Sequence, residues 1–206
     1  MVRAAPFLLA LVLACAASAA GARTAAVTIN FDDHPAGVDA STLYQSQGIT
    51  FTRDDGQGIP ILDWSSLRRT TTSPPNVLAT IYQPPVSTTY VTHLNVIASA
   101  PLVAIGAYFG NDQGSFDFAF IRLTAYDASN QEVGSVEVAV NNNTSVDQFI
   151  GLTSAIPFVR ARFENFASTR LPSGNYSVVL DDLTFTKDVT TAAGTSSWGK
   201  IKRMYR

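Results

Sequence analysis

Four aspartates near the two ends of the chain's strand-like region are its best candidates for chemistry. Asp32 and Asp33 follow the alternating run Val-Thr-Ile-Asn-Phe, and Asp181 and Asp182 precede Leu-Thr-Phe. Counting by two places Asp33 and Asp181 in phase with the apolar residues of their segments. Because a buried carboxylate without a partner is costly, a bound cation would offset that cost. Calcium is the natural candidate, since it takes six to eight oxygen ligands.

The metal hypothesis therefore names Asp33 and Asp181 first. Asp32 and Asp182 could contribute from adjacent positions if a β-bulge turns them toward the ion. A second interpretation is that all four end strands and bond to nearby main-chain N–H groups, as Asp often does. The sequence contains no EF-hand-like loop, so both interpretations stay open.

Catalytic residues are scarce in this sequence. His34 and His93 are the only histidines, and no G-x-S-x-G motif accompanies them. Glycoside hydrolysis needs two carboxyl groups across a cleft, and no pair of acids is singled out by spacing. We expect both histidines to be structural or exposed, and the protein not to be an enzyme.

Aromatic residues near the predicted loops and strand ends offer a route to ligand binding. Their rings could stack on sugar rings, although aromatic residues also commonly fill β-sandwich cores. The candidates are Trp64, Tyr82, Tyr90 and Tyr108. The implied partner is a glycan or another cell-surface component.

The elements that would position these residues are short strands. Apolar residues recur with a period of two through most of the chain, and clusters rich in Gly, Pro, Asn and Asp separate the segments. About nine or ten strands at this spacing predict an all-β fold, an antiparallel β-sandwich of the jelly-roll or lectin-like kind. The predicted strands cover residues 27–31, 49–52, 90–99, 102–109, 116–126, 132–140, 149–152, 158–163 and 177–186.

Composition excludes several other classes of function. The 206 residues are 46% hydrophobic and 15% charged, with a net charge of −2, which is enough apolar material for one well-packed domain. One cysteine and two histidines exclude a disulfide framework and a thiol–zinc cluster. With 14 basic residues against 16 acidic ones, a broad nucleic-acid surface is not expected.

Residues 1–22 read as an export signal. A basic start is followed by a short apolar run and by small residues that suit cleavage after Ala22. An alternative is lipoprotein processing, with Cys15 lipidated and kept as an anchor. No later apolar segment is long enough to span a bilayer, so we expect a secreted or cell-surface protein with its folded domain at 24–188.

The last residues differ in character from this domain. Residues 189–194 form a small-residue linker, and residues 195–206 carry four basic residues and no acidic one. Apolar residues at helical spacing predict a short basic amphipathic helix there. It could dock on the acidic domain, lie on an anionic surface, serve as a sorting address, or simply be frayed. The residues involved are Trp198, Ile201, Lys202, Arg203 and Tyr205.

Several short motifs carry a family resemblance. The sequence Ile-Asn-Phe-Asp-Asp-His-Pro-Ala-Gly at 29–37, the stretch 44–51 and Leu-Asp-Asp-Leu-Thr-Phe at 180–185 resemble secreted bacterial β-sandwich proteins of the PEP-CTERM-associated type. Shorter matches lie at 75–78, 123–128 and 149–152. The resemblance implies an extracellular jelly-roll module similar to carbohydrate-binding and lectin-like sandwiches, some with calcium between first and last strands. The Pro-Glu-Pro motif and membrane helix that end such proteins are absent here.

Together these patterns predict a secreted, non-catalytic binding module directed at carbohydrate or extracellular matrix. The alternative is a structural or adhesive surface protein that is attached or sorted through its C-terminal tail. The ligand and the oligomeric state are not encoded in any pattern that we recognise.

Overall fold

The computed structural model describes residues 25–67, 69–80, 93–110, 118–141, 143, 145–167 and 177–189. The predicted signal peptide with Cys15, the candidates Tyr82 and Tyr90, and the C-terminal tail lie outside the described residues. So does most of the predicted linker. Within the described part of the chain, no helix is long and apolar enough to cross a membrane.

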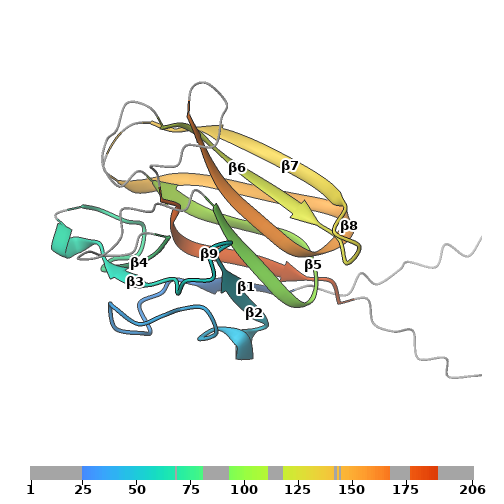
Figure 1. Cartoon of the computed structure of the whole chain (residues 1–206), viewed down its shortest axis with the longest axis horizontal. Coiled ribbons are helices and arrows are strands. Elements are labelled where there is room, and N and C mark those ends of the chain that lie inside the picture. Colours follow the sequence, from blue (N-terminus) through green and yellow to red (C-terminus); the bar gives the residue numbers. More distant parts are fainter. Residues whose placement is uncertain are drawn as a thin grey trace, which may run out of the picture. The chain divides into compact units, whose positions relative to one another are not determined.

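Nine strands and two short 3-10 helices make up the described structure (Figure 1). The predicted all-β, antiparallel arrangement is confirmed, because every pairing between these strands is antiparallel. The elements are β1 (Ala26–Ile29), η1 (Gln45–Gln47), β2 (Ile49–Thr52), β3 (Ile61–Asp63), η2 (Ser65–Leu67), β4 (Asn76–Ala79), β5 (His93–Gly110), β6 (Phe118–Tyr126), β7 (Glu132–Ala139), β8 (Val146–Ala167) and β9 (Val179–Lys187).

Two long strands, β5 and β8, belong to both layers of the sandwich. The N-terminal part of β5 pairs with β2 and with the C-terminal part of β8, which also pairs with β6; β7 follows β6. We call these strands the first half-sheet. The C-terminal part of β5 pairs with the N-terminal part of β8 and with β9, which also pairs with β1 and β4; β3 follows β4. We call these the second half-sheet.

The sequence predicted two separate strands where the structure has one continuous β5, and likewise for β8. The breaks were placed at 100–101 and at 153–157, where both strands contain proline. Register shifts in the β5–β8 ladder lie between Ile97 and Leu102 and between Leu102 and Ala104. The chain thus passes from one half-sheet to the other at these irregular points without leaving the strand.

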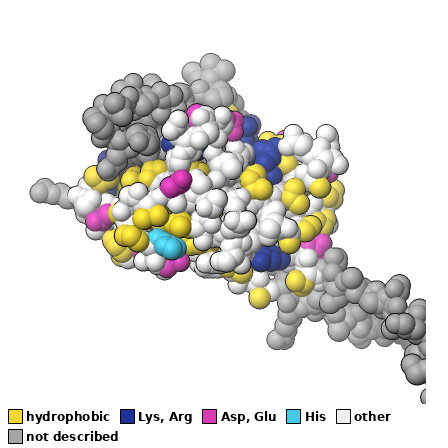
Figure 2. All heavy atoms as spheres, turned by 60° about the horizontal axis from the view of Figure 1, so that its bottom comes forward, with side chains coloured by type: hydrophobic (Ala, Val, Ile, Leu, Met, Phe, Trp, Pro, Cys, Tyr) yellow, Lys and Arg dark blue, Asp and Glu magenta, His cyan; other side chains and the backbone are white. Residues whose placement is uncertain are grey.

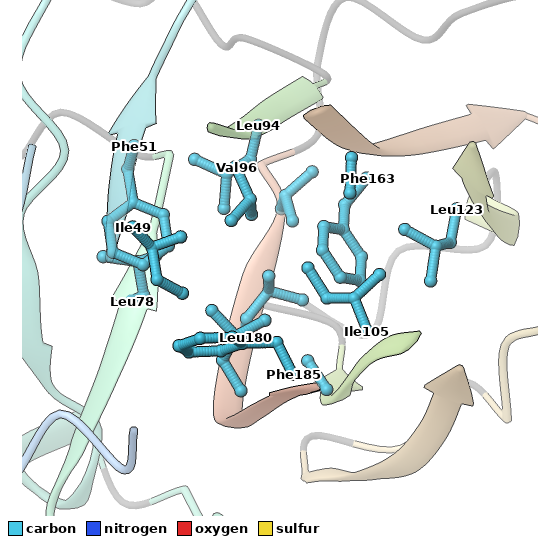
Figure 3. Packing of buried hydrophobic residues seen from close by; sticks show 14 of the residues in the cluster. Ile49, Phe51, Leu78, Leu94, Val96, Ile105, Leu123, Phe163, Leu180 and Phe185 are labelled. Atoms are coloured by element: carbon cyan, nitrogen blue, oxygen red, sulfur yellow. The ribbon is translucent and has the colours of Figure 1, made fainter. Parts of the chain in front are cut away.

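The core lies between the two half-sheets. Leu123 and Phe163 from the first half-sheet pack in one buried cluster with Ile105 and Phe185 from the second. Figure 3 shows these side chains pointing into the same space. A smaller cluster lies on the opposite face of the second half-sheet, against Tyr108, and consists of Leu62, Trp64, Val77, Ala79, Val146 and Val179.

The antiparallel pairing of β1 with β9 is the feature of the fold that bears most directly on the candidate residues. Ile29 lies opposite Leu183, and Val27 lies opposite Phe185. The first and last predicted strands are therefore neighbours. Asp32 and Asp33 follow β1. Because β1 lies beside β9, they follow the neighbour of the strand that contains Asp181 and Asp182.

Candidate functional site

Asp181 lies on the opposite face of β9 from the one that the sequence predicts. Asp182 has a φ of 47°, and the pairing of β9 with β5 shifts register between Gly106 and Tyr108. This β-bulge adds one residue to β9 and inverts its alternation. Leu183 and Phe185 face the core, whereas Asp181 lies opposite Tyr108, which packs on the outer cluster. The expectation that Asp181 shares the core face was wrong for this reason.

The carboxylate of Asp181 is fully buried and accepts hydrogen bonds on both oxygens. Oδ2 accepts from the Ser73 N–H at 2.8 Å, from the Thr72 hydroxyl at 3.0 Å and from the Thr71 hydroxyl. Oδ1 accepts from the Ser73 hydroxyl at 2.9 Å and from the Asp182 N–H at 2.8 Å. These bonds fasten residues 71–73 to the outer face of β9.

Burial raises the pKa of Asp181 above its ordinary value. The hydrogen bonds from Thr71 and Ser73 lower this pKa in part, and the nearby charge of Asp182 raises it further. Desolvation therefore outweighs the stabilising contacts in this site.

The other three aspartates have separate partners. Asp33 is half-exposed, with 51% of its side chain accessible, and accepts a hydrogen bond from the Tyr44 hydroxyl at 2.7 Å. Its predicted burial was wrong, because Phe31 has a φ of 64° and the strand alternation stops before it. Asp32 accepts from the Asn76 N–H at 2.9 Å. Asp182 Oδ1 lies 2.9 Å from the Ser73 hydroxyl, whose single proton is shared between Asp181 and Asp182.

Calcium at these aspartates stays a prediction. No group of three or more His, Cys, Asp or Glu side chains is placed to hold a metal ion within the ranges that the structure describes. For Asp181, the hydrogen bonds offset part of the cost of burial that a cation was invoked to offset.

Both histidines contact carboxylates near the surface. The Nε2 atom of His34 lies 3.8 Å from Asp33 Oδ2, and that of His93 lies 2.6 Å from Asp54 Oδ2. His93 starts β5, and Asp54 belongs to the turn after β2. Each histidine ring therefore lies beside a carboxylate of a neighbouring turn or loop residue.

Of the two predicted aromatic candidates that the structure describes, one is unavailable. Trp64 is fully buried in the outer cluster, so neither of its ring faces can meet a ligand, and its predicted role was wrong. Tyr108 is half-buried on β5 and packs against the same cluster. Its other neighbour is Phe149, whose ring centroid lies 5.4 Å away in an edge-to-face arrangement.

Phe149, which the sequence analysis did not single out, is the most exposed aromatic side chain that the structure describes. Its accessible fraction is 52%, although it lies in β8. A Cβ atom on Gly106 would lie 2.5 Å from Phe149 Cζ, and one on Gly151 would lie 2.6 Å from Cε1. The ring therefore rests on the bare backbone of two neighbouring strands, and Tyr108 contacts it from the side.

A cavity of about 260 Å³ opens beside this ring on the outer face of the second half-sheet. Strand register places Gly151, Gly106, Thr184 and Thr28 side by side across β8, β5, β9 and β1. The hydroxyls of Thr28 and Thr184 are 2.9 Å apart. No ionisable side chain is among the described residues that line the cavity, which are Ala104, Ile105, Gly106, Phe149, Gly151, Leu152, Thr153, Thr184, Phe185 and Thr186.

A larger cavity, of about 440 Å³, lies between β2 and the turns on either side of it. Most of its lining residues carry polar side chains, among them Arg53, whose guanidinium donates to Asp55 at 2.6 Å. The one aromatic residue in the lining, Phe51, is 1% exposed and points into the core. The Phe149 cavity is therefore the better candidate for a ligand with an apolar face.

No protein-family model matches this chain. No curated protein matches it either. Solved structures to which this chain is similar include the K2 cleaved adhesin domain of Lys-gingipain, with a TM-score of 0.49, 17% identity, and coverage of 79% of this chain and 99% of that one.

Two further similar structures are carbohydrate-binding modules. The CBM22-1 xylan-binding domain of Xyn10C from Paenibacillus barcinonensis has a TM-score of 0.43 and 12% identity, covering 78% of this chain and 92% of that one. TmCBM61, solved in complex with β-1,4-galactotriose, has a TM-score of 0.41 and 10% identity, covering 77% and 99%. Because these identities are low, the ligand of this chain has to be inferred from its own side chains.

Proposed function

We propose that this protein is a non-catalytic glycan-binding module whose ligand lies on Phe149, across the outer face of the second half-sheet. The observation that carries the proposal is an exposed aromatic ring held against the backbone of Gly106 and Gly151. Covering the exposed face of this ring with an apolar surface removes both from water, which is favourable. The apolar C–H face of a pyranose fits such a ring, because the negative π face of the ring attracts polarised C–H groups.

The polar half of the site comes from threonines. Thr184 and Thr186 on β9 and Thr153 on β8 line the same cavity as Phe149. A hydroxyl both donates and accepts hydrogen bonds, so it matches the hydroxyls around a sugar ring. The side chains thus combine an apolar surface with a few polar groups, which is typical of small-molecule sites.

The lining also indicates an uncharged sugar. The described residues around the cavity include no Lys, Arg, Asp or Glu, so a charged group on the ligand would lose hydration without gaining a partner. Cleavage of a glycosidic bond would need a pair of carboxyl groups flanking it. The described lining supplies neither, which favours binding over catalysis.

An extracellular or cell-surface setting is part of this proposal, with the ligand in a polysaccharide or extracellular matrix. It is supported by the signal-like character of residues 1–22. A structural or adhesive role for the sandwich is the competing interpretation, and the binding experiment separates the two.

The test compares Phe149→Ala with Ile156→Ala in the full chain. Ile156 is a matched control, because it is also an exposed apolar residue of β8, at 56% accessibility, and does not line the cavity. A glycan array identifies ligands of the wild type, and calorimetry with the best neutral oligosaccharide gives the affinities. We expect Phe149→Ala to weaken binding by about 10-fold to 30-fold, as for an aromatic hot spot, and Ile156→Ala to leave it unchanged.

Three outcomes would refute the proposal. One is a wild type that binds none of the neutral glycans on a broad array. Another is an equal loss of affinity in both variants. The third is binding that Phe149→Ala leaves intact.

A further inference from the structure

The outer face of the first half-sheet carries a second feature that glycan binding at Phe149 does not use. Three arginines lie on this face, Arg122 on β6 and Arg160 and Arg162 on β8. Arg122 pairs with Glu137 of the neighbouring β7. Arg162 lies 3.4 Å from Glu164 and 3.6 Å from Asp54. The third arginine has different surroundings.

The guanidinium of Arg160 is held in place by neutral groups. Its central carbon lies 3.8 Å from the centroid of the Tyr126 ring, which is its direct neighbour on β6. Nη1 donates to the Asn95 side-chain oxygen at 3.1 Å, and Nη2 donates to the Asn130 side-chain oxygen. Asn130 occupies the left-handed region, with a φ of 60°, in the turn between β6 and β7. Three different elements therefore fix one cation.

These contacts orient the charge of Arg160 without neutralising it. Amide oxygens accept hydrogen bonds but carry no net charge, and no ion pair to Arg160 occurs within the described ranges. The guanidinium has five N–H donors in a planar fork, and the two bonds above use only part of them. A pre-oriented guanidinium without an acidic partner is well suited to a planar oxyanion, which it binds through two parallel hydrogen bonds.

We propose that Arg160 forms a carboxylate-binding site for an acidic sugar on the first half-sheet, separate from the neutral site at Phe149. The Tyr126 ring and the two amide hydrogen bonds hold the guanidinium in place, and its remaining N–H donors are the groups that would bind the carboxylate. The ligand class is a uronic-acid-containing glycan. The site does not depend on Phe149, because that residue belongs to the other half-sheet.

The proposal concerns a local site and not a broad basic surface. On the one face of the molecule that Figure 2 shows, Lys and Arg side chains form small separate groups among neutral and hydrophobic atoms. Binding of a long polyanion by a continuous positive field is therefore not what this proposal requires. One fixed guanidinium per ligand carboxylate is enough, and the affinity should fall as salt screens the exposed pair.

The experiment uses oligomers of galacturonic acid and, as neutral counterparts, galactose oligomers of the same length. Calorimetry compares the wild-type full chain with Arg160→Gln and with Arg122→Gln. Arg122 is the matched control, because it also stacks on an aromatic ring, at 4.6 Å from Phe166, but has Glu137 as its partner. We expect Arg160→Gln to weaken galacturonate binding at least 10-fold and Arg122→Gln to change it less than 2-fold.

A conservative variant keeps the test informative if Arg160→Gln folds poorly. Arg160→Lys retains the charge but loses the planar fork, so we expect it to bind galacturonate more weakly than the wild type. No galacturonate binding by the wild type, equal effects of the Arg160 and Arg122 variants, or full binding by Arg160→Lys would each overturn the proposal. Phe149→Ala distinguishes the two sites, since it should leave galacturonate binding intact.

Discussion

Replacing Asp181 by asparagine tests whether its hydrogen bonds fasten residues 71–73 to β9. Two of the donors to Asp181 are main-chain N–H groups, that of Ser73 on Oδ2 and that of Asp182 on Oδ1, both at 2.8 Å. Asparagine has one oxygen and one NH₂ group, so either orientation points the NH₂ group at one of these donors. The hydroxyls of Thr71 and Thr72 can turn to accept a hydrogen bond, but a main-chain N–H cannot.

One buried donor is therefore left without an acceptor in Asp181→Asn, which costs about 1–3 kcal/mol of unfolding free energy. With a urea dependence of about 2 kcal/mol per molar, a loss of 2 kcal/mol lowers the unfolding midpoint by about 1 M. Circular dichroism of the full chain in a urea titration measures this shift. Asp182→Asn is the matched control, because Asn tolerates a positive φ and the Asp182 carboxylate accepts only from the Ser73 hydroxyl among the hydrogen bonds described.

Urea titrations of the wild type and of Asp181→Asn at several pH values test whether the pKa of Asp181 is raised. Because burial raises the pKa of Asp181, its contribution to stability is complete below about pH 4 and is lost as the pH rises through the raised value. Asparagine does not titrate in this range. The stability difference between wild type and Asp181→Asn should therefore narrow from pH 4 upward. A difference that widens with pH would show that the hydrogen bonds outweigh desolvation. An Asp181→Asn midpoint equal to that of the wild type at about pH 4, where the expected difference is largest, would refute the network's role.

Four further predictions concern stability. A Cβ on Gly106 would lie 2.9 Å from a main-chain oxygen of β8, so Gly106→Ala should lower the unfolding free energy by about 1–3 kcal/mol in urea titrations and reduce glycan affinity. Burial raises the pKa of Asp55, but hydrogen bonds from the buried Arg53 and from a main-chain N–H hold this pKa below its ordinary value. Asp55→Ala should therefore lower the unfolding free energy by about 2–3 kcal/mol at neutral pH. This loss should shrink below about pH 4, where the unfolded chain binds the proton more readily than the folded one. Tyr44→Phe removes a hydrogen bond from a buried ring to a carboxylate and should cost about 1 kcal/mol, which thermal unfolding detects. If calcium binds the four candidate aspartates, it should raise the melting temperature relative to a chelator, and an unchanged midpoint would remove the hypothesis.

The sequence was sufficient for the fold class because period-two alternation is a local signal. It predicted most strands. It missed β3 and β4, which are only three and four residues long. The jelly-roll assignment within the β-sandwich class stays a prediction, as does the resemblance to PEP-CTERM-associated proteins.

The prediction that Asp181 shares the core face failed because one extra residue in β9 changes which side chains face the core. Alternation assigns faces correctly only while the ladder is regular, and the extra residue at Asp182 moves Asp181 to the outer face. No feature of Leu-Asp-Asp-Leu announces this bulge, since Asp is only one of several residues that tolerate a positive φ. The hydrogen-bond partners of Asp181, Thr71 to Ser73, are more than 100 positions away in the sequence.

A usable signal for Phe149 was present in the sequence. Gly106 and Gly151 interrupt two predicted strands, and glycine inside a strand often marks a close approach of another group. An aromatic residue two positions before Gly151 is on the same strand face, so it can cover that backbone. The solvent-facing side of 149–152 has no local signal, because Phe149 lies on one face, Ile150 and Leu152 lie on the other, and no charged residue marks either.

The continuity of β5 and β8 affects how this protein unfolds. Each strand contributes backbone hydrogen bonds to both half-sheets, so loosening one layer disturbs the ladders of the other. Proteins often open in separate cooperative units, but such units need boundaries that few hydrogen bonds cross. Here two uninterrupted backbones cross that boundary. These two strands connect the layers covalently, as a disulfide within the chain would. The sequence has a single cysteine, so no disulfide within the chain can do this.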